Sequence, residues 1–122
     1  MDDARKFVGD DGENRACAYL LRRGYEILRR NYRTNGGEID IIAASAGTVI
    51  FVEVKTFPRG TPELLAGALG RRKQKRIVKT AKCFLAKNRQ YSSSYIRFDV
   101  IVNDMPGFPP VYHLENAFAE LL

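Results

Sequence analysis

Two short apolar stretches in the middle of the chain dominate its hydrophobic pattern. Residues 39–44 are apolar at every position except Asp40, and residues 49–54 at every position except Glu53. Between them lies Ser-Ala-Gly at residues 45–47, a sequence typical of a tight turn. Strands that are apolar at nearly every position, instead of alternating, are usually covered on both faces. We therefore expect a two-stranded hairpin buried in the middle of a layered domain.

The register of this hairpin brings charged residues together. If residues 46–47 form a two-residue loop, counting back places Asp40 opposite Glu53 and Glu38 opposite Lys55. Alternation along a strand then puts Asp40, Glu53 and Lys55 on one face of the sheet. Two facing carboxylates repel each other and lose hydration, so a positive charge must accompany them. Either Lys55 supplies it, in a buried ion-pair cluster without chemistry, or a divalent cation with oxygen ligands does.

The remaining pattern predicts helices and strands on both sides of the hairpin. It indicates a helix over residues 9–23, a strand over 25–33, a short helix over 63–69, a long helix over 71–88, and strands over 95–102 and 111–114. Glu13 lies on the apolar stripe of the first helix, so its side chain is expected on the core side. It is either a first-turn acid that the helix dipole favours or a third carboxylate for the acidic pair.

The long helix combines an apolar stripe with basic side chains on its other faces. No acidic residue interrupts the basic ones, so ordinary ion pairs between successive turns do not explain the pattern. Contact with phosphate groups is the better interpretation, ahead of a merely solvated face. We expect nucleic-acid contacts from Arg71, Arg72, Lys73, Lys75, Arg76, Lys79 and Lys82. Gln74, at the start of the stripe, is predicted either to touch a metal-bound water or a phosphate, or to serve in capping or packing.

Length and composition limit the classes of protein that fit. A chain of 122 residues is expected to form one domain with a real core, over residues 1–122. A net charge of +6 and a pI near 9.5 favour a polyanionic partner such as nucleic acid. No apolar run approaches the roughly 18 residues that span a membrane, and the N-terminus has no apolar signal core. We therefore expect a cytoplasmic protein without membrane contact.

Few residues offer other chemistry. Cys17 and Cys83 match no metal-binding spacing and lie in helical, apolar surroundings, so buried reduced thiols are expected. His113 is the only histidine, which argues against a zinc site and against Ser-His catalysis. Asp99 and Arg97 share a face of their predicted strand and are expected to form a structural ion pair.

The spacing of the acids and the lysine suits phosphodiester cleavage. Carboxylates hold one or two Mg²⁺ ions, which polarise the phosphate, supply hydroxide near neutral pH and stabilise the leaving oxygen. By position, Asp40 and Glu53 would be metal ligands and Val54 would add its backbone carbonyl. Glu13 would reach in from its helix, directly or through water. The Lys55 ammonium would steady the attacking water or the charge that develops on phosphorus.

Ordered motifs along nearly the whole chain resemble those of a known family. They are Gly12-Glu13 with Ala16 and Leu20, Gly24-Tyr25, Arg30-Asn31-Tyr32-Arg33, Gly37-Glu38-Ile39-Asp40-Ile41-Ile42, Phe51-Val52-Glu53-Val54-Lys55, Lys73-Gln74-Lys75-Arg76, Arg97-Phe98-Asp99-Val100 and Asn116-Ala117-Phe118. By these motifs the chain resembles the uncharacterised bacterial YraN-like family, within the restriction-endonuclease-like PD-(D/E)xK superfamily, and it is similar in layout to archaeal Holliday-junction resolvases. The resemblance implies an α/β fold with a three-layer core, in which helices flank a mixed central β-sheet.

The resemblance also implies roles for individual residues. Glu13 falls on the helix acid of the nuclease relatives, and Asp40 falls on their metal-binding aspartate. Glu53 falls on the second metal acid, and Lys55 falls on the catalytic lysine. Position 39 is Ile instead of the proline in the superfamily's name, as is common in this family. Residues 56–57, Thr-Phe, depart from relatives that often place a basic residue there.

Three hypotheses of different class follow. The leading one is an endonuclease that depends on Mg²⁺ or Mn²⁺ and hydrolyses phosphodiester bonds in DNA, including branched or damaged DNA, with DNA favoured over RNA. The alternative is a nucleic-acid-binding protein with weak or no cleavage, which uses the same groove and the basic helix. In a structural or partner-recruiting protein, the acids would form only an ion-pair network. Because junction-cutting relatives act as symmetric dimers, a homodimer is expected by analogy.

Overall fold

The computed structural model describes residues 11–119, which have a mixed α/β fold. In chain order the elements are α2 (Asp11–Arg22), β1 (Glu26–Thr34), β2 (Gly37–Ser45), β3 (Thr48–Thr56), α3 (Pro62–Ala68), α4 (Arg71–Lys87), a 3₁₀ turn η1 (Arg89–Tyr91), β4 (Tyr95–Asn103) and β5 (Val111–Phe118). Each helix and strand that the sequence predicts is present, although β5 continues to Phe118 instead of ending at residue 114. Residues 9 and 10 of the predicted first helix lie outside the described residues.

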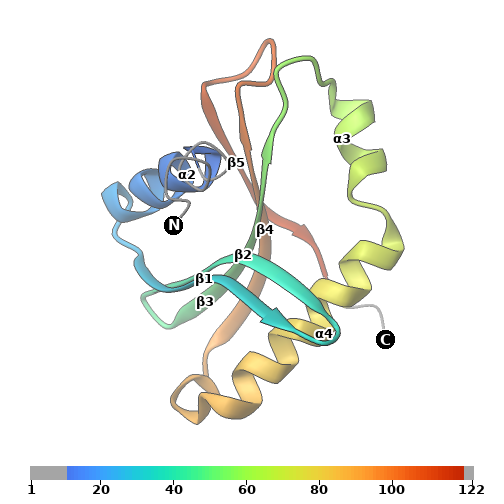
Figure 1. The fold of residues 1–122 in the computed structure, drawn as a ribbon. Coiled ribbons are helices and arrows are strands. Elements are labelled where there is room, and N and C mark those ends of the chain that lie inside the picture. The colour runs from blue at the N-terminus through green and yellow to red at the C-terminus, as the bar shows by residue number, and fades with distance from the viewer. Residues whose placement is uncertain (1–10, 120–122) are drawn as a thin grey trace, which may run out of the picture.

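The five strands form one sheet in the order β1-β2-β3-β4-β5. Neighbouring strands are antiparallel except β3 and β4, which run parallel. Parallel neighbours need a long crossover connection, and α3 and α4 supply it. The sheet is the middle of three layers, because α2 packs on one face and α3 and α4 pack on the other (Figure 1). The predicted mixed central sheet flanked by helices is therefore confirmed.

Apolar cores fill the spaces between the layers. Leu20 of α2 packs with Ile50 on one face of the sheet, and Phe84 of α4 packs with Phe51 on the other. Leu65 of α3 belongs to a third cluster on the α4 side. Each fully buried side chain of this size stabilises the fold by about 2 kcal/mol. Since successive β3 residues serve opposite cores, the strand has to be apolar at nearly every position.

Both cysteines are free thiols. Cys17 is buried, as predicted, and burial raises the pKa of its thiol. Cys83, in α4, is only half-buried, so the prediction that both thiols are buried is wrong for this one. Among residues 11–119, no helix combines the length and the apolar character that a membrane crossing requires.

The turn of the β2–β3 hairpin is as predicted. Ser45 pairs with Thr48, so residues 46–47 are the two-residue loop. Ala46 and Gly47 have φ angles of 48° and 83°. Two positive φ angles in such a loop match the right-handed twist of the flanking strands. The turn sequence therefore fixes the register over this half of the hairpin.

The other half of the hairpin differs from the prediction. Paired residues end at positions 41 and 52, so the expected pairs of Asp40 with Glu53 and of Glu38 with Lys55 do not form. The reason lies in the Asp40 side chain, whose Oδ2 accepts a hydrogen bond of 2.8 Å from the Val54 N–H. A carboxylate thus takes the place that a β2 carbonyl would have in a regular ladder.

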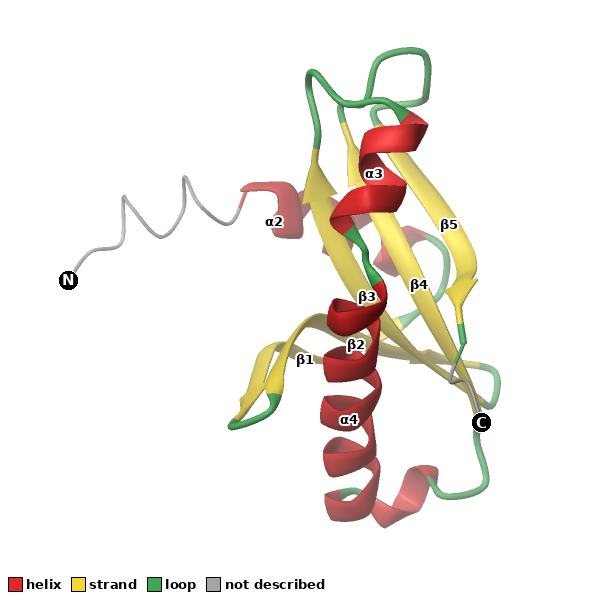
Figure 2. Ribbon diagram, turned by 90° about the vertical axis from the view of Figure 1, so that its right-hand side faces the viewer, coloured by secondary structure: helices red, strands yellow, loops and turns green. Residues whose placement is uncertain are grey.

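β2 bends away from β3 at this point. Ile39 and Ile42 belong to the same core cluster, although strict alternation would put them on opposite faces of the sheet. In the neighbouring strand β1, Asn31 has a φ of 52° beside the bend, although the pairs of β1 with β2 keep one register from Arg30 to Thr34. The far end of the β1–β2 hairpin therefore stands away from β3 and β4 (Figure 2). This departure from a flat sheet creates the space for a site.

Candidate active site

A groove of about 600 Å³ lies between the bent end of the β1–β2 hairpin and the start of α4. Asp40 and Glu53 line it from the strands, and Lys73 and Arg76 line it from the helix. Much of the remaining wall is the hairpin turn, residues 33–38. The structure thus brings the two predicted acids to one groove, although they are not cross-strand partners.

Two lysines contact one of these acids. The Glu53 side chain is 7% exposed, and its Oε2 lies 2.7 Å from Lys73 Nζ and 3.5 Å from Lys55 Nζ. Lys55 follows Glu53 by two residues along β3, so both side chains project from the same face. Lys73 comes from the first turn of α4. The sequence assigned Lys73 only to the nucleic-acid surface, because its contact with Glu53 depends on where α4 lies against the sheet.

The two acids of the groove differ in their surroundings, because both lysine contacts are to Glu53. Burial and the charge of Glu53 raise the pKa of Asp40 from its ordinary 3.8 to about 7, against the effect of the hydrogen bond from the Val54 N–H. Burial lowers the pKa of the Lys73 ammonium, but the hydrogen bond and the charge of Glu53 outweigh it, so this pKa is raised. The lysines therefore leave Asp40 only partly compensated, and an added cation would be attracted to it.

Glu13 reaches this group from α2. Its side chain is 14% exposed, and its Oε1 lies 3.4 Å from an Arg30 guanidinium nitrogen. The same oxygen accepts a hydrogen bond of 3.1 Å from Asn31 Nδ2. The negative charge of Glu13 adds to the rise in the pKa of Asp40. The structure thus places Glu13 near the pair, as predicted, and gives it an arginine and an amide as partners.

Gly12 sets how closely α2 approaches the sheet. A Cβ atom at this position would lie 2.5 Å from the side-chain oxygen of Thr56, at the end of β3. Asn103, at the end of the neighbouring strand β4, donates a hydrogen bond of 3.0 Å from Nδ2 to the Gly12 carbonyl. The absence of a side chain therefore lets the first turn of α2, with Glu13, lie against the ends of two central strands.

Gln74 points elsewhere. Its Nε2 donates a hydrogen bond of 2.7 Å to the carbonyl of Leu69, the C-cap of α3. Its side chain also lines an apolar cavity of about 400 Å³ between α3 and strands β4 and β5. This is the capping and packing role that the sequence left open, and the amide has no contact with the acids in this arrangement.

The oxygen atoms of the groove suit a hard cation. Within residues 11–119, no three His, Cys, Asp or Glu side chains lie close enough together to hold a metal ion by themselves. Mg²⁺ keeps several waters and takes only one or two carboxylates from a protein, together with phosphate oxygens. Asp40 and Glu53 are a donor set of that kind. Binding would require Lys73 to release Glu53, because its ammonium lies where a cation would be held.

The basic residues of α4 divide between two sides of the helix. Lys73 and Arg76 line the groove of the acids. Other residues of the helix line a second, outer groove of about 230 Å³, next to Val78. The cations of this outer groove are Arg71, Lys75, Lys79 and Lys82. Arg72 is also exposed, so the helix presents positive charge along most of its outer length.

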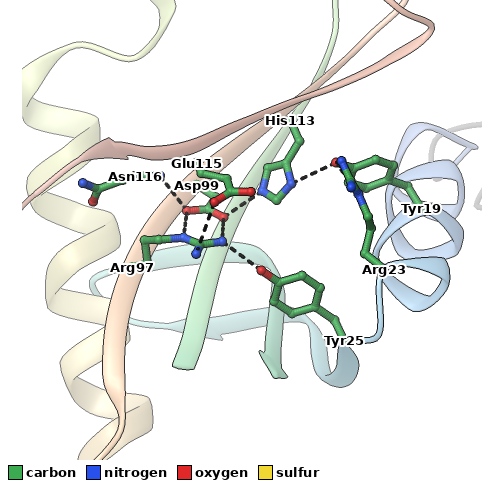
Figure 3. Close-up of polar contacts among 8 residues, drawn as sticks. All are labelled: Tyr19, Arg23, Tyr25, Arg97, Asp99, His113, Glu115 and Asn116. Atoms are coloured by element: carbon green, nitrogen blue, oxygen red, sulfur yellow. Dashed lines mark hydrogen bonds and ion pairs between the residues drawn. The ribbon is translucent and has the colours of Figure 1, made fainter. Parts of the chain in front are cut away.

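A second polar cluster lies on the α2 face of the sheet, around Asp99 (Figure 3). Arg97 donates two hydrogen bonds, of 2.9 and 2.8 Å, to the Asp99 carboxylate, which confirms the predicted ion pair. His113 Nε2 lies 2.7 Å from the same carboxylate, and the Asn116 N–H donates to it at 2.9 Å. Arg97 also donates a hydrogen bond of 2.9 Å to the Tyr25 hydroxyl.

This cluster has the features of a structural element. Asp99 is fully buried, and burial opposes its ionisation, but the hydrogen bonds of His113 and Arg97 outweigh burial and hold its pKa at about 2. Tyr19 extends the chain of contacts to α2, since its hydroxyl lies 3.2 Å from His113 Nδ1. The cluster therefore joins α2 to β4 and β5. His113 could not have been placed here from the sequence, because its partners are distant along the chain.

Fold and groove together define a mixed α/β domain in which two carboxylates and two lysines meet beside a basic helix. The chain belongs to the Uncharacterised protein family UPF0102, whose sequence model matches residues 12–102, a range that contains all four of these residues. A UPF0102 protein of Treponema pallidum (strain Nichols) is 45% identical over 126 aligned positions that cover the whole of both chains. Another, from Geobacter metallireducens, is 45% identical over 117 positions and 93% of each chain. A third, from Clostridium botulinum (strain Loch Maree), is 39% identical over 124 positions, 97% of this chain and 98% of its own.

Proposed function

We propose that the protein is a Mg²⁺-dependent endonuclease that hydrolyses phosphodiester bonds in DNA. The observation that carries the proposal is the meeting of Asp40, Glu53, Lys55 and Lys73 in and around one groove beside α4. Phosphodiester cleavage needs oxygen ligands for a hard cation and positive charge for the phosphate. The basic outer side of α4 adds a surface for further phosphates.

The order of the site residues along the chain supports the same proposal. Asp40 precedes the Glu53-x-Lys55 motif on two adjacent central strands, which is the arrangement of the PD-(D/E)xK superfamily that the chain resembles. The resemblance to junction resolvases also favours DNA over RNA, with branched or damaged DNA among the substrates. By the same analogy we propose a homodimer, and a cytoplasmic location for the protein.

Each residue would have a distinct task. Asp40 and Glu53 would hold Mg²⁺ or Mn²⁺, the Val54 carbonyl would be a further oxygen ligand, and Glu13 would act directly or through water. The bound ion would polarise the phosphate and supply hydroxide near neutral pH. Lys55, 3.5 Å from Glu53, would orient the attacking water or stabilise charge on the phosphate oxygens.

A cleavage assay with matched variants tests the proposal. Linear, flapped and four-way DNA, and RNA, are incubated with Mg²⁺, with Mn²⁺ or with a chelator. We expect cleavage only with metal, and a loss of about a hundredfold or more in Asp40→Ala and in Lys55→Ala, since each removes an electrostatic contribution to the transition state. Glu26→Gln, which removes an exposed acid at the start of β1, is the control and should keep wild-type activity. Cleavage that survives Asp40→Ala would rule out the assigned site.

A nucleic-acid-binding protein with weak or no cleavage is the second candidate. The contact of 2.7 Å between Lys73 Nζ and Glu53 favours it, because an ammonium already neutralises one of the acids. For this candidate, binding measured by fluorescence anisotropy would not require metal and would survive Asp40→Ala. Charge reversal on α4, in the triple variant with Lys75, Arg76 and Lys79 replaced by Glu, would abolish it. A protein that shows neither binding nor cleavage would belong to the partner-recruiting class.

A further inference from the structure

Two ammonium groups share a single buried carboxylate oxygen. Lys73 Nζ lies 2.7 Å and Lys55 Nζ 3.5 Å from Glu53 Oε2. Lys55 is tied to Glu53 by the strand that carries both residues, whereas Lys73 reaches it from α4 across the groove. The Lys73 side chain is 34% exposed and that of Lys55 26%, so Lys73 is the more solvent-accessible of the two partners as well as the one that the strand does not hold.

The position of Lys73 in α4 also gives it a second attraction. It lies in the first turn of the helix, where the helix dipole disfavours a cation and favours an anion. Arg71 and Arg72 precede it, the first turn contains no acidic residue, and the N-cap Gly70 supplies no side-chain hydrogen bond. Arg76 lines the same groove as Lys73, so a phosphate that enters this groove would meet two cations beside a helix N-terminus. Lys73 therefore stands between two acceptors, Glu53 and a bound phosphate.

We propose that Lys73 is a displaceable counter-ion, which neutralises Glu53 in the free protein and is drawn away by a phosphate of the bound nucleic acid so that Glu53 can hold Mg²⁺. The inference rests on the proposed function, and it adds an order to it: the metal ion binds well only when the substrate is present. By linkage, the metal ion and the nucleic acid must strengthen each other's binding by the same factor. Glu53 thus remains neutralised until a phosphodiester enters the groove.

Metal titration without nucleic acid is the first test. Mg²⁺ binding is measured by calorimetry for the wild type, Lys73→Met and Lys75→Met; the last removes the same charge from the outer side of α4, two residues away. We expect Lys73→Met to bind Mg²⁺ about tenfold more tightly than the wild type, because the ion no longer competes with an ammonium. Lys75→Met should stay within about twofold of the wild type. Lys73→Gln, which keeps a polar side chain, should behave like Lys73→Met.

The outcomes separate this inference from the proposed function. Equal Mg²⁺ affinity in the wild type, Lys73→Met and Lys75→Met, abolished by Asp40→Asn, would overturn the counter-ion role and leave the metal site standing. Equal gains in the two lysine variants would also overturn it, since they would reflect general charge only. Failure of all these proteins to bind Mg²⁺ would overturn the metal-dependent function together with the inference.

A coupling measurement is the second test. The affinity for a fluorescent DNA duplex is measured by anisotropy with and without Ca²⁺, a cation with the same preference for oxygen ligands. Ca²⁺ should tighten DNA binding by about tenfold in the wild type and in Lys75→Met, and by less than about threefold in Lys73→Met. The same coupling in all three proteins would refute the displacement of Lys73.

Discussion

Replacing Asp40 by asparagine should make the protein more stable at alkaline pH. Burial and the neighbouring charge of Glu53 raise the pKa of Asp40 to about 7, so the native state holds this proton more tightly than the unfolded chain does. Between about pH 4 and pH 7 the unfolded chain loses the proton first, and the free energy of unfolding falls as the pH rises. Asparagine has nearly the same shape, keeps an oxygen for the Val54 N–H and carries no charge. Asp40→Asn therefore removes this fall in the free energy of unfolding.

The size of the effect follows from the shift. A rise from 3.8 to about 7 is roughly 3 pKa units, and each unit corresponds to about 1.4 kcal/mol, which sets a ceiling of about 4 kcal/mol. Water in the open groove and the two lysine ammonium groups screen the charge of Asp40. We therefore expect Asp40→Asn to exceed the wild type by about 2 kcal/mol at about pH 8, and by almost nothing at about pH 4.

Urea unfolding followed by circular dichroism, at about pH 4.5 and about pH 8, measures this difference. Glu26→Gln, an exposed acid in the same sheet, is the control and should keep the pH dependence of the wild type. In a Lys73→Met background, where no ammonium from α4 competes for Glu53, Mg²⁺ at the higher pH should stabilise the protein that keeps Asp40 and not the one with Asp40→Asn. If Asp40→Asn shares the pH dependence of the wild type, or is less stable at both pH values, the carboxylate pair is not a source of instability.

Three other tests, each by substitution, concern contacts described above. Asp99→Asn breaks a fully buried ion-pair cluster and should lower the free energy of unfolding by about 3 kcal/mol at neutral pH. Because the pKa of Asp99 in the native state is held at about 2, this stabilisation is lost as the pH falls from about 4 through 2. The free energies of unfolding of the two proteins, measured with urea, should therefore converge in acid. Gly12→Ala should lower the free energy of unfolding by about 1–3 kcal/mol, since its Cβ would meet Thr56 Oγ1 at 2.5 Å. In thermal unfolding, adding Thr56→Ala should recover part of this stability, and strictly additive effects of the two substitutions would contradict the contact. Lys75→Glu combined with Lys79→Glu should weaken DNA binding and reduce the slope of log affinity against log salt by about 2, and an unchanged slope would show that the outer face of α4 does not touch phosphates.

The sequence predicted the elements well wherever the signal was local. The apolar runs around Ala46 and Gly47 specified two strands and their turn, because a two-residue loop with positive φ angles fixes its own register. The far end of that hairpin could not be predicted in the same way. There the Asp40 side chain accepts the hydrogen bond of the Val54 N–H in place of a backbone carbonyl, and a hydrophobic pattern cannot reveal such a replacement. The acids still meet, by a bend in β2 instead of by cross-strand pairing.

The candidate site shows the same limit. Asp40, Glu53 and Lys55 are close in sequence and are predicted as a group; in the structure Asp40 and Glu53 line one groove, and Lys55 lies 3.5 Å from Glu53. The contact of Lys73 with Glu53 was missed, because it depends on the placement of α4 against the sheet. The hydrogen bond of Gln74 with the end of α3 could not be predicted from helical spacing either, because residues on the apolar stripe of α4 face more than one neighbouring element.

The parallel pairing of β3 with β4 has a consequence for how the domain is made. Thr48 pairs with Tyr95, 47 positions later, so the newly made β1–β3 meander must wait with one strand edge unpaired while α3 and α4 are synthesised. At about 5–20 residues per second, the ribosome needs several seconds to deliver the missing strand. An apolar strand with an open edge is a template for association with other chains during that time. The strongly cationic helix emerges within this interval, and its charge would keep neighbouring nascent chains apart.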